Sequence, residues 1–168
     1  MIAKKHSYGL LYLVFLFIIL NISCSVPEEG IRDMSIDLSL VNNNDWKMSK
    51  DILTYINLHR LELNKKPLIL DSLYATAYAI QHSKYMIETR TVNHNNFYKR
   101  SEGLKKRGAV KVAENVAYAY SSAQSVVNAW IKSVEHRGVI ESNFTHIGFG
   151  VLKCIEENRY YYTTLYYK

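Results

Sequence analysis

The sequence predicts an α+β fold in which helices pack against an antiparallel sheet. Segments with helical periodicity occupy the first and middle parts of the chain, and two extended segments close it at 145–153 and 159–167. Helices and strands segregated in this order are typical of α+β domains. The 168 residues, 48% of them hydrophobic, are enough for one domain with a sizeable core.

Two helices are predicted before residue 90 from apolar residues at helical spacing. Ser49 can cap the first, Pro67 follows its end, and its stripe consists of Ile52, Ile56, His59 and Leu63. Asp71 can cap the second, whose two adjacent apolar stripes indicate a helix packed on two sides. His82 lies on one of these stripes and is interpreted as a packing histidine.

A third helix has the clearest amphipathic pattern in the chain. Ser121 and Gln124 have the spacing of a capping box, and an apolar face follows, made of Ala123, Val126, Val127, Trp130, Ile131 and Val134. Between residues 91 and 120 the periodicity fades, and the apolar run 112–116 is interrupted by a carboxylate and an amide. Two such polar groups are unexpected inside an apolar run.

The two C-terminal segments are predicted to form a hairpin with its turn at Asn158. The first alternates apolar residues with Gly148 and Gly150, which we expect to admit close packing of a helix on the sheet. The second is rich in Tyr and Thr, which have high strand propensity. Cys154 lies at a strand end and is interpreted as a small buried hydrophobe.

Residues 1–23 have the layout of a secretory signal peptide. Lys4 and Lys5 precede a short apolar run, and Cys24 follows a small residue, as in a bacterial lipobox. We therefore expect cleavage before Cys24, a lipid on this cysteine and an exported, membrane-anchored lipoprotein in the periplasm or on the cell surface. The alternatives are an ordinary signal peptide or an N-terminal anchor helix.

Residues 24–47 are polar and acidic and are interpreted as a lipid-anchored linker, with a weak strand signal within 35–41. The folded domain is then expected to span residues 48–168. The formal net charge is +6, but Lys and Arg are scattered along the chain, so nucleic-acid binding is not expected.

Three residues at loop or helix ends have chemistry suited to a metal ion. His94, Glu114 and His136 offer imidazole and carboxylate ligands, which suit Zn²⁺ or another divalent cation. Their spacing alone is not a zinc signature, since the chain has no HExxH motif and no CxxC pair.

The order of motifs between Ser49 and Tyr167 resembles the CAP superfamily, which comprises cysteine-rich secretory proteins, antigen 5 and pathogenesis-related 1 proteins. The segments that carry the resemblance are Ile56 to Arg60, Lys66 to Leu68, His82-Ser83, Ala113 to Ala117, Val126-Val127 with Trp130, His136-Arg137 and Thr145 to Gly150. The resemblance implies a three-layer α/β/α sandwich around a central antiparallel sheet.

Many members of this family hold a divalent metal between two His and two Glu. His94 and His136 match the two His, and Glu114 matches the first Glu, whereas Ser133 stands at the position of the second. Glu135 is nearby as an accessory candidate. Alternatively, Glu114 and Asn115 anchor the loop by hydrogen bonds and the histidines bond to it without metal.

The resemblance favours a protein that binds a lipid, glycan or peptide ligand in a His/Glu cleft, with or without metal. A second hypothesis is an envelope hydrolase or peptidase in which a metal or Glu114 activates water. A third is a structural protein that acts through its surface. The identity of the ligand or envelope partner does not follow from the sequence.

Overall fold

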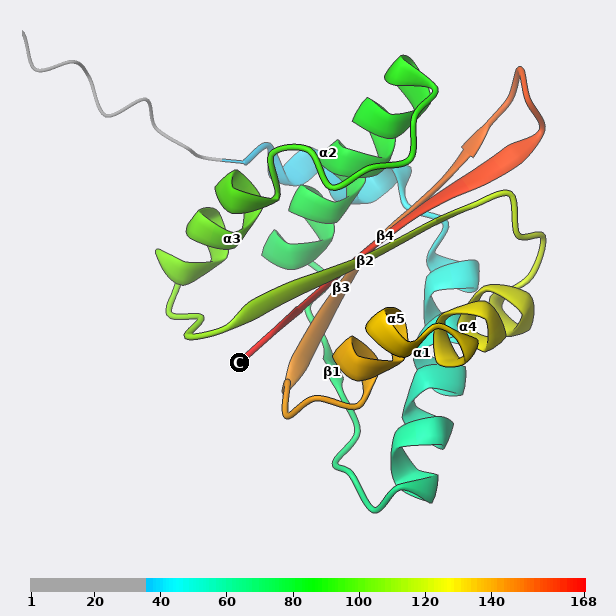
Figure 1. Cartoon of the computed structure of the whole chain (residues 1–168). Coiled ribbons are helices and arrows are strands. Elements are labelled where there is room, and N and C mark those ends of the chain that lie inside the picture. Colours follow the sequence, from blue (N-terminus) through cyan, green and yellow to red (C-terminus); the bar gives the residue numbers. More distant parts are fainter. Residues whose placement is uncertain (1–35) are drawn as a thin grey trace, which may run out of the picture. The chain divides into compact units, whose positions relative to one another are not determined.

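The computed structural model describes residues 36–168 and confirms the α+β fold (Figure 1). In chain order the elements are the 3-10 helix η1 (Leu38–Asn43), α1 (Trp46–Glu62), β1 (Ile69–Leu70), α2 (Tyr74–Thr89), α3 (Phe97–Lys105), β2 (Val112–Tyr118), α4 (Ala123–Lys132), α5 (Val134–Ile140), β3 (His146–Cys154) and β4 (Arg159–Tyr167). Within this part of the chain, no helix is long and apolar enough to cross a membrane.

The four strands form one sheet in the order β1-β3-β4-β2. β4 pairs antiparallel with β3, as the hairpin prediction requires, and on its other side it pairs antiparallel with β2. β1 adds a two-residue parallel pairing to β3, from Ile69 to His146 and Leu70 to Ile147, which the sequence did not predict. Among residues 36–168, β2 is therefore an edge strand, paired on one side only.

Helices cover both faces of the sheet and complete the three layers. Figure 1 shows α2 and α3 on one side and α1, α4 and α5 on the other. The larger core joins Ile52 of α1 and Trp130 of α4 to Phe149 and Tyr162 of the sheet. The opposite face is closed by a second apolar cluster of Ile36, Ala75, Ala77, Tyr78, Ala79, Leu104, Ala109 and Leu165.

Two glycines of β3 let α2 lie directly on the sheet, as predicted. A Cβ atom at Gly148 would lie 2.4 Å from the carbonyl carbon of Ala75, and one at Gly150 would lie 2.2 Å from the backbone of Ala79. No side chain fits at either distance. The absence of a Cβ therefore determines how closely α2 approaches and where its polar residues lie.

The structure corrects the boundary expected at residue 48, because residues 36–47 belong to the domain. η1 packs against α2 in place of the tether or short strand that the sequence suggested. Asn44 is buried, and its Oδ1 accepts a hydrogen bond from the backbone N–H of Val151 at 2.9 Å. Asp45, not Ser49, caps α1 by accepting from Met48 N–H.

Three polar side chains of this segment, those of Asp37, Asn44 and Asp45, thus bond to the main chain, while most of its other polar residues are exposed. Residues 1–35 lie outside the described part. The signal peptide, cleavage before Cys24 and lipidation of Cys24 therefore remain predictions.

Candidate functional site

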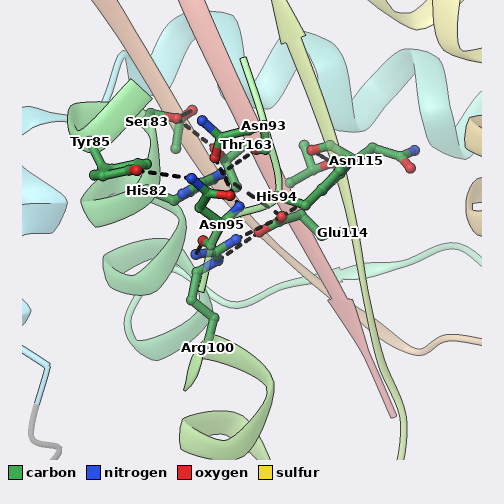
Figure 2. A network of polar contacts seen from close by, with 12 residues as sticks. His82, Ser83, Tyr85, Asn93, His94, Asn95, Arg100, Glu114, Asn115 and Thr163 are labelled. Atoms are coloured by element: carbon green, nitrogen blue, oxygen red, sulfur yellow. Dashed lines mark hydrogen bonds and ion pairs between the residues drawn. The ribbon is translucent and has the colours of Figure 1, made fainter. Parts of the chain in front are cut away.

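Glu114 lies on β2 with its side chain directed to the face that α2 and α3 cover. Its carboxylate is 1% exposed and accepts three hydrogen bonds (Figure 2). Arg100 of α3 donates from Nε to Oε2 at 2.7 Å and from Nη2 to Oε1 at 2.8 Å. His94, in the loop before α3, donates from Nδ1 to Oε1 at 2.8 Å. The carboxylate that interrupts the apolar run 112–116 is thus a buried group with three hydrogen bonds.

The pKa of Glu114 is set by two opposing influences. Burial raises it, but the hydrogen bonds from His94 and Arg100 and the charge of Arg100 outweigh burial, so the pKa lies below its usual value. Glu114 is therefore ionised at neutral pH and forms a charge-assisted, bidentate pair with Arg100.

The loop that carries His94 is held by further side chains of this network. Arg100 Nη1 donates to the backbone carbonyl of Asn95 at 2.8 Å, and His82 Nε2 donates to the carbonyl of Asn93 at 2.7 Å. His82 also stacks on Tyr85, with ring centroids 5.9 Å apart. The loop conformation is consequently set from α3 on one side and from α2 on the other.

His82 is neutral in this setting. Its Nε2 lies 4.0 Å from Glu114 Oε1, but burial and the charge of Arg100 hold its pKa below the usual value. The sequence interpreted His82 as a packing residue. Its side chain is indeed buried, and it also fixes the loop that presents His94.

His94 is the exposed member of the network, with 52% of its side chain accessible. Because Nδ1 bonds to Glu114, the neutral form of the ring carries its proton there, and Nε2 of that form can accept a hydrogen bond. Within residues 36–168, no hydrogen bond uses this nitrogen. A buried carboxylate thus orients a half-exposed imidazole and fixes its tautomer.

His136 lies in α5, on the opposite face of the sheet from His94. Its Nδ1 shares a hydrogen bond of 2.8 Å with Ser133 Oγ, and Ser133 caps α5. Asn115 Nδ2 donates to the His136 carbonyl at 3.1 Å, which ties α5 to β2. Burial lowers the pKa of His136, and the charge that His94 carries when protonated lowers it further.

The structure places the predicted site residues in two groups, one on each face of the sheet. His94 contacts Glu114 directly, and Ser133 and Asn115 position His136. Glu135 is exposed and, in the described part of the chain, makes no hydrogen bond or ion pair with the network. It does not replace the second Glu of the family pattern.

These residues do not fit a divalent metal ion as they are arranged. Both oxygens of Glu114 are occupied, and the guanidinium of Arg100 places a positive charge where a cation would have to bind. Across residues 36–168, no group of three or more His, Cys, Asp or Glu side chains could hold a metal ion. The arrangement is that of hydrogen-bond donors and acceptors.

Sequence reasoning missed Arg100. It lies in the stretch without periodicity, which the structure shows to contain the nine-residue helix α3. One signal was present, because a carboxylate inside an apolar run needs a buried partner. Nothing in the spacing of the sequence indicated which of the many basic residues would supply it.

A cavity of about 650 Å³ adjoins the network between η1, α2 and the segment 95–100. His82 and Arg100 form part of its wall, together with Tyr78, Tyr85 and several polar side chains. Pockets of a few hundred cubic ångströms are of the size that encloses small ligands. The buried side chains of His82 and Arg100 thus border this cavity.

Comparison with known proteins agrees with this architecture. Residues 53–167 match the CAP, or cysteine-rich secretory protein, family, so the chain belongs to that family. The chain is 31% identical over 155 residues to the uncharacterized membrane protein YlbC of Bacillus subtilis (strain 168). That alignment covers 84% of this chain and 42% of YlbC, so the chain spans about two fifths of that relative.

Solved bacterial structures share the fold. An outer surface protein from Borrelia burgdorferi superposes with a TM-score of 0.65 at 24% identity, covering 73% of this chain and 93% of the other. An extracellular protein containing an SCP domain from Bacillus anthracis str. Ames gives a TM-score of 0.62 at 25% identity, covering 71% of this chain and 39% of the other.

Proposed function

We propose that the protein is an exported, lipid-anchored member of the CAP family that binds a lipid, glycan or peptide ligand beside His94, Glu114 and His136, without requiring a metal. The supporting observation is the Glu114 network. Its buried carboxylate is bonded by Arg100 and orients the exposed imidazole of His94. Preorganised polar groups of this kind give a site specificity at little entropic cost.

Two lines of support favour export. The first 24 residues have the layout of a lipoprotein signal, and the similar Bacillus anthracis protein is described as extracellular. YlbC is described as a membrane protein. A lipid on Cys24 would hold the domain at a membrane.

The experiment is a binding screen on the full-length chain in detergent, with muropeptides, phospholipids and linear peptides as probes. Any ligand of the site should bind at least about tenfold more weakly to His94→Ala, since a lost hydrogen bond and the loss of ring contacts each weaken binding. Glu135→Ala is the matched control, because this exposed carboxylate neighbours His136 but is not bonded to the network.

Two results would overturn the proposal. One is that none of the three probe classes binds in a way that depends on His94. The other is that the wild-type chain hydrolyses an envelope polymer and Glu114→Gln abolishes the turnover, which would make the site catalytic.

A further inference from the structure

The edge strand β2 directs alternate backbone groups away from the sheet. Lys111 and Lys168 exchange both of their backbone hydrogen bonds, at 3.3 and 3.1 Å, and Ala119 N–H donates to the Tyr160 carbonyl at 2.9 Å. Antiparallel pairing alternates, so the odd-numbered residues of β2 bond to β4. The N–H and C=O groups of its even-numbered residues point to the open side of the strand.

One contact confirms this direction and shows where the edge is covered. Trp130 Nε1 of α4 donates to the Val116 carbonyl at 3.1 Å, so an indole ring occupies the open side at that residue. Earlier in the strand, no hydrogen bond within the described part uses the main chain of Val112 or Glu114 on this side. The edge is therefore open at residues 112–114.

The exposure of Glu114 supports this conclusion. Its side chain is 1% exposed, whereas the residue as a whole is 8% exposed. The remaining accessible surface of this residue consequently lies on its main chain. Buried main-chain groups are almost always paired, so groups left unpaired at a solvent-accessible edge are available to a partner.

The open edge lies between the two histidines of the site. On one face of the sheet, the Glu114 side chain bonds to His94. On the other face, the Asn115 side chain bonds to the backbone of His136. A chain lying along the edge would direct successive side chains to these two faces in turn.

We propose that the edge of β2 at Val112 and Glu114 binds a peptide in extended conformation, which adds a fifth strand to the sheet. This inference rests on the proposed function and names a peptide as the ligand class. Val112 and Glu114 present two N–H and C=O pairs about 7 Å apart, the two-residue repeat of an extended chain. Lipids and glycans lack this repeat, whereas strand addition is an established mode of peptide binding.

The first test measures single-residue hydrogen exchange on the full-length chain in detergent. The probe is the tightest binder selected from a library of linear hexapeptides. In the free protein, the amides of Val112 and Glu114 should exchange fast and those of Ala113 and Asn115 slowly. Addition of the peptide should slow Val112 and Glu114 by about tenfold or more, because both gain hydrogen bonds.

The second test scans the peptide with N-methyl groups. Methylation at alternate positions should weaken binding by about tenfold at each bonded position, and methylation at the positions between them should have little effect. This alternation depends on the backbone of the peptide and is independent of any change in the protein.

A matched pair of protein variants tests the edge itself. Val112→Pro removes an N–H that points away from β4, a placement that edge strands tolerate. Val112→Ala removes most of the same side chain and keeps the N–H. Peptide affinity should fall in Val112→Pro and be nearly unchanged in Val112→Ala. If Val112→Pro fails to fold, the N-methyl scan decides.

Three outcomes would overturn the edge proposal. They are failure to select any peptide, binding that is insensitive to alternate N-methylation, and protection of Val112 and Glu114 without peptide in a concentration-dependent dimer. The last result would identify a second copy as the occupant. If a glycan or lipid still binds in a way that depends on His94, the proposed function stands without the edge proposal. If no ligand binds in a way that depends on His94, both proposals fail.

Discussion

Arg100 of α3 and Glu114 of β2 form a buried two-pronged pair, with Nε 2.7 Å from Oε2 and Nη2 2.8 Å from Oε1. Their side chains are 5% and 1% exposed. The pair neutralises the carboxylate that the family resemblance assigned to a metal ion. It leaves His94 as the network's exposed hydrogen-bonding group, and this relationship yields the first three predictions.

Removing Arg100 alone will destabilise the domain. Arg100→Met leaves Glu114 buried without its cation, and breaking such a pair costs about 3–5 kcal/mol. Urea denaturation should show this loss in the free energy of unfolding. The double variant Arg100→Met/Glu114→Leu should recover most of it, because no unpaired charge then remains. A loss under about 0.5 kcal/mol in the single variant, the range of neutral surface changes, would contradict the prediction.

Acid should lower the stability of the folded domain, partly by protonating Glu114. Its folded-state pKa lies below the ordinary 4.5, because the bonds from His94 and Arg100 outweigh the opposing influence of burial. The carboxylate therefore stabilises the fold at pH values above 4.5 and loses this contribution as the pH falls through the folded-state pKa.

Glu114→Gln should accordingly reduce the loss of stability on acidification, measured by urea denaturation at several pH values. The exposed Glu135→Gln is the control and should follow the wild type. A Glu114→Gln curve parallel to that of the wild type would show that this carboxylate does not titrate differently on folding.

Zinc should not bind saturably to the wild-type site at micromolar concentration. Arg100 holds both carboxylate oxygens, and a cation would have to displace a buried guanidinium. Calorimetric titration of the full-length chain with Zn²⁺ measures this directly. Micromolar binding that disappears in His94→Ala/His136→Ala would establish a metal site and contradict the prediction.

The close approach of α2 to β3 should make Gly148 intolerant of any side chain. A Cβ there would lie 2.4 Å from the backbone of Ala75, so Gly148→Ala should cost about 3 kcal/mol or more through displaced backbone. Gly138, on α5, has open space around its Cβ position. Gly138→Ala should stabilise by about 0.5–1 kcal/mol, as expected for alanine in a helix. Equal melting temperatures for the two variants would refute this account.

Lipid attachment should depend on Cys24. Cells grown with a fatty-acid analogue should label the wild-type protein and leave Cys24→Ser unlabelled, because the thiol is the acceptor in a lipobox. Cys154→Ser is the matched control, since Cys154 is buried in the domain. Label that persists in Cys24→Ser would rule out this anchor.

Local patterns in the sequence determined much of the fold. The amphipathic periodicity predicted α4, which buries one face, and the Tyr/Thr run predicted β4, whose consecutive residues are buried on both faces of the sheet. The predicted apolar face ran on to Val134, but α4 ends at Lys132 and Val134 is an exposed residue of α5. The α4 cap was predicted one residue early, because Ser122 and Ser125 form the capping box rather than Ser121 and Gln124. The glycines of β3 correctly predicted close helix packing.

Elements with weak local signals were not predictable in this way. α3 is mostly polar and β1 has only two residues, so neither shows a clear period. η1 packs through a few apolar side chains against α2, a contact between segments well separated in the sequence that local periodicity does not report.

For the site, the sequence by itself determined the family pattern and the residues His94, Glu114 and His136. The tertiary structure decided what Glu114 bonds to, because Arg100 reaches it from an element with no sequence signal. It also decided that β2 lies at the edge of the sheet, so that the main chain of Glu114 is partly accessible while its side chain is buried. Periodicity reports which face of an element is buried, whereas pairing of polar groups across elements depends on how those faces meet in space.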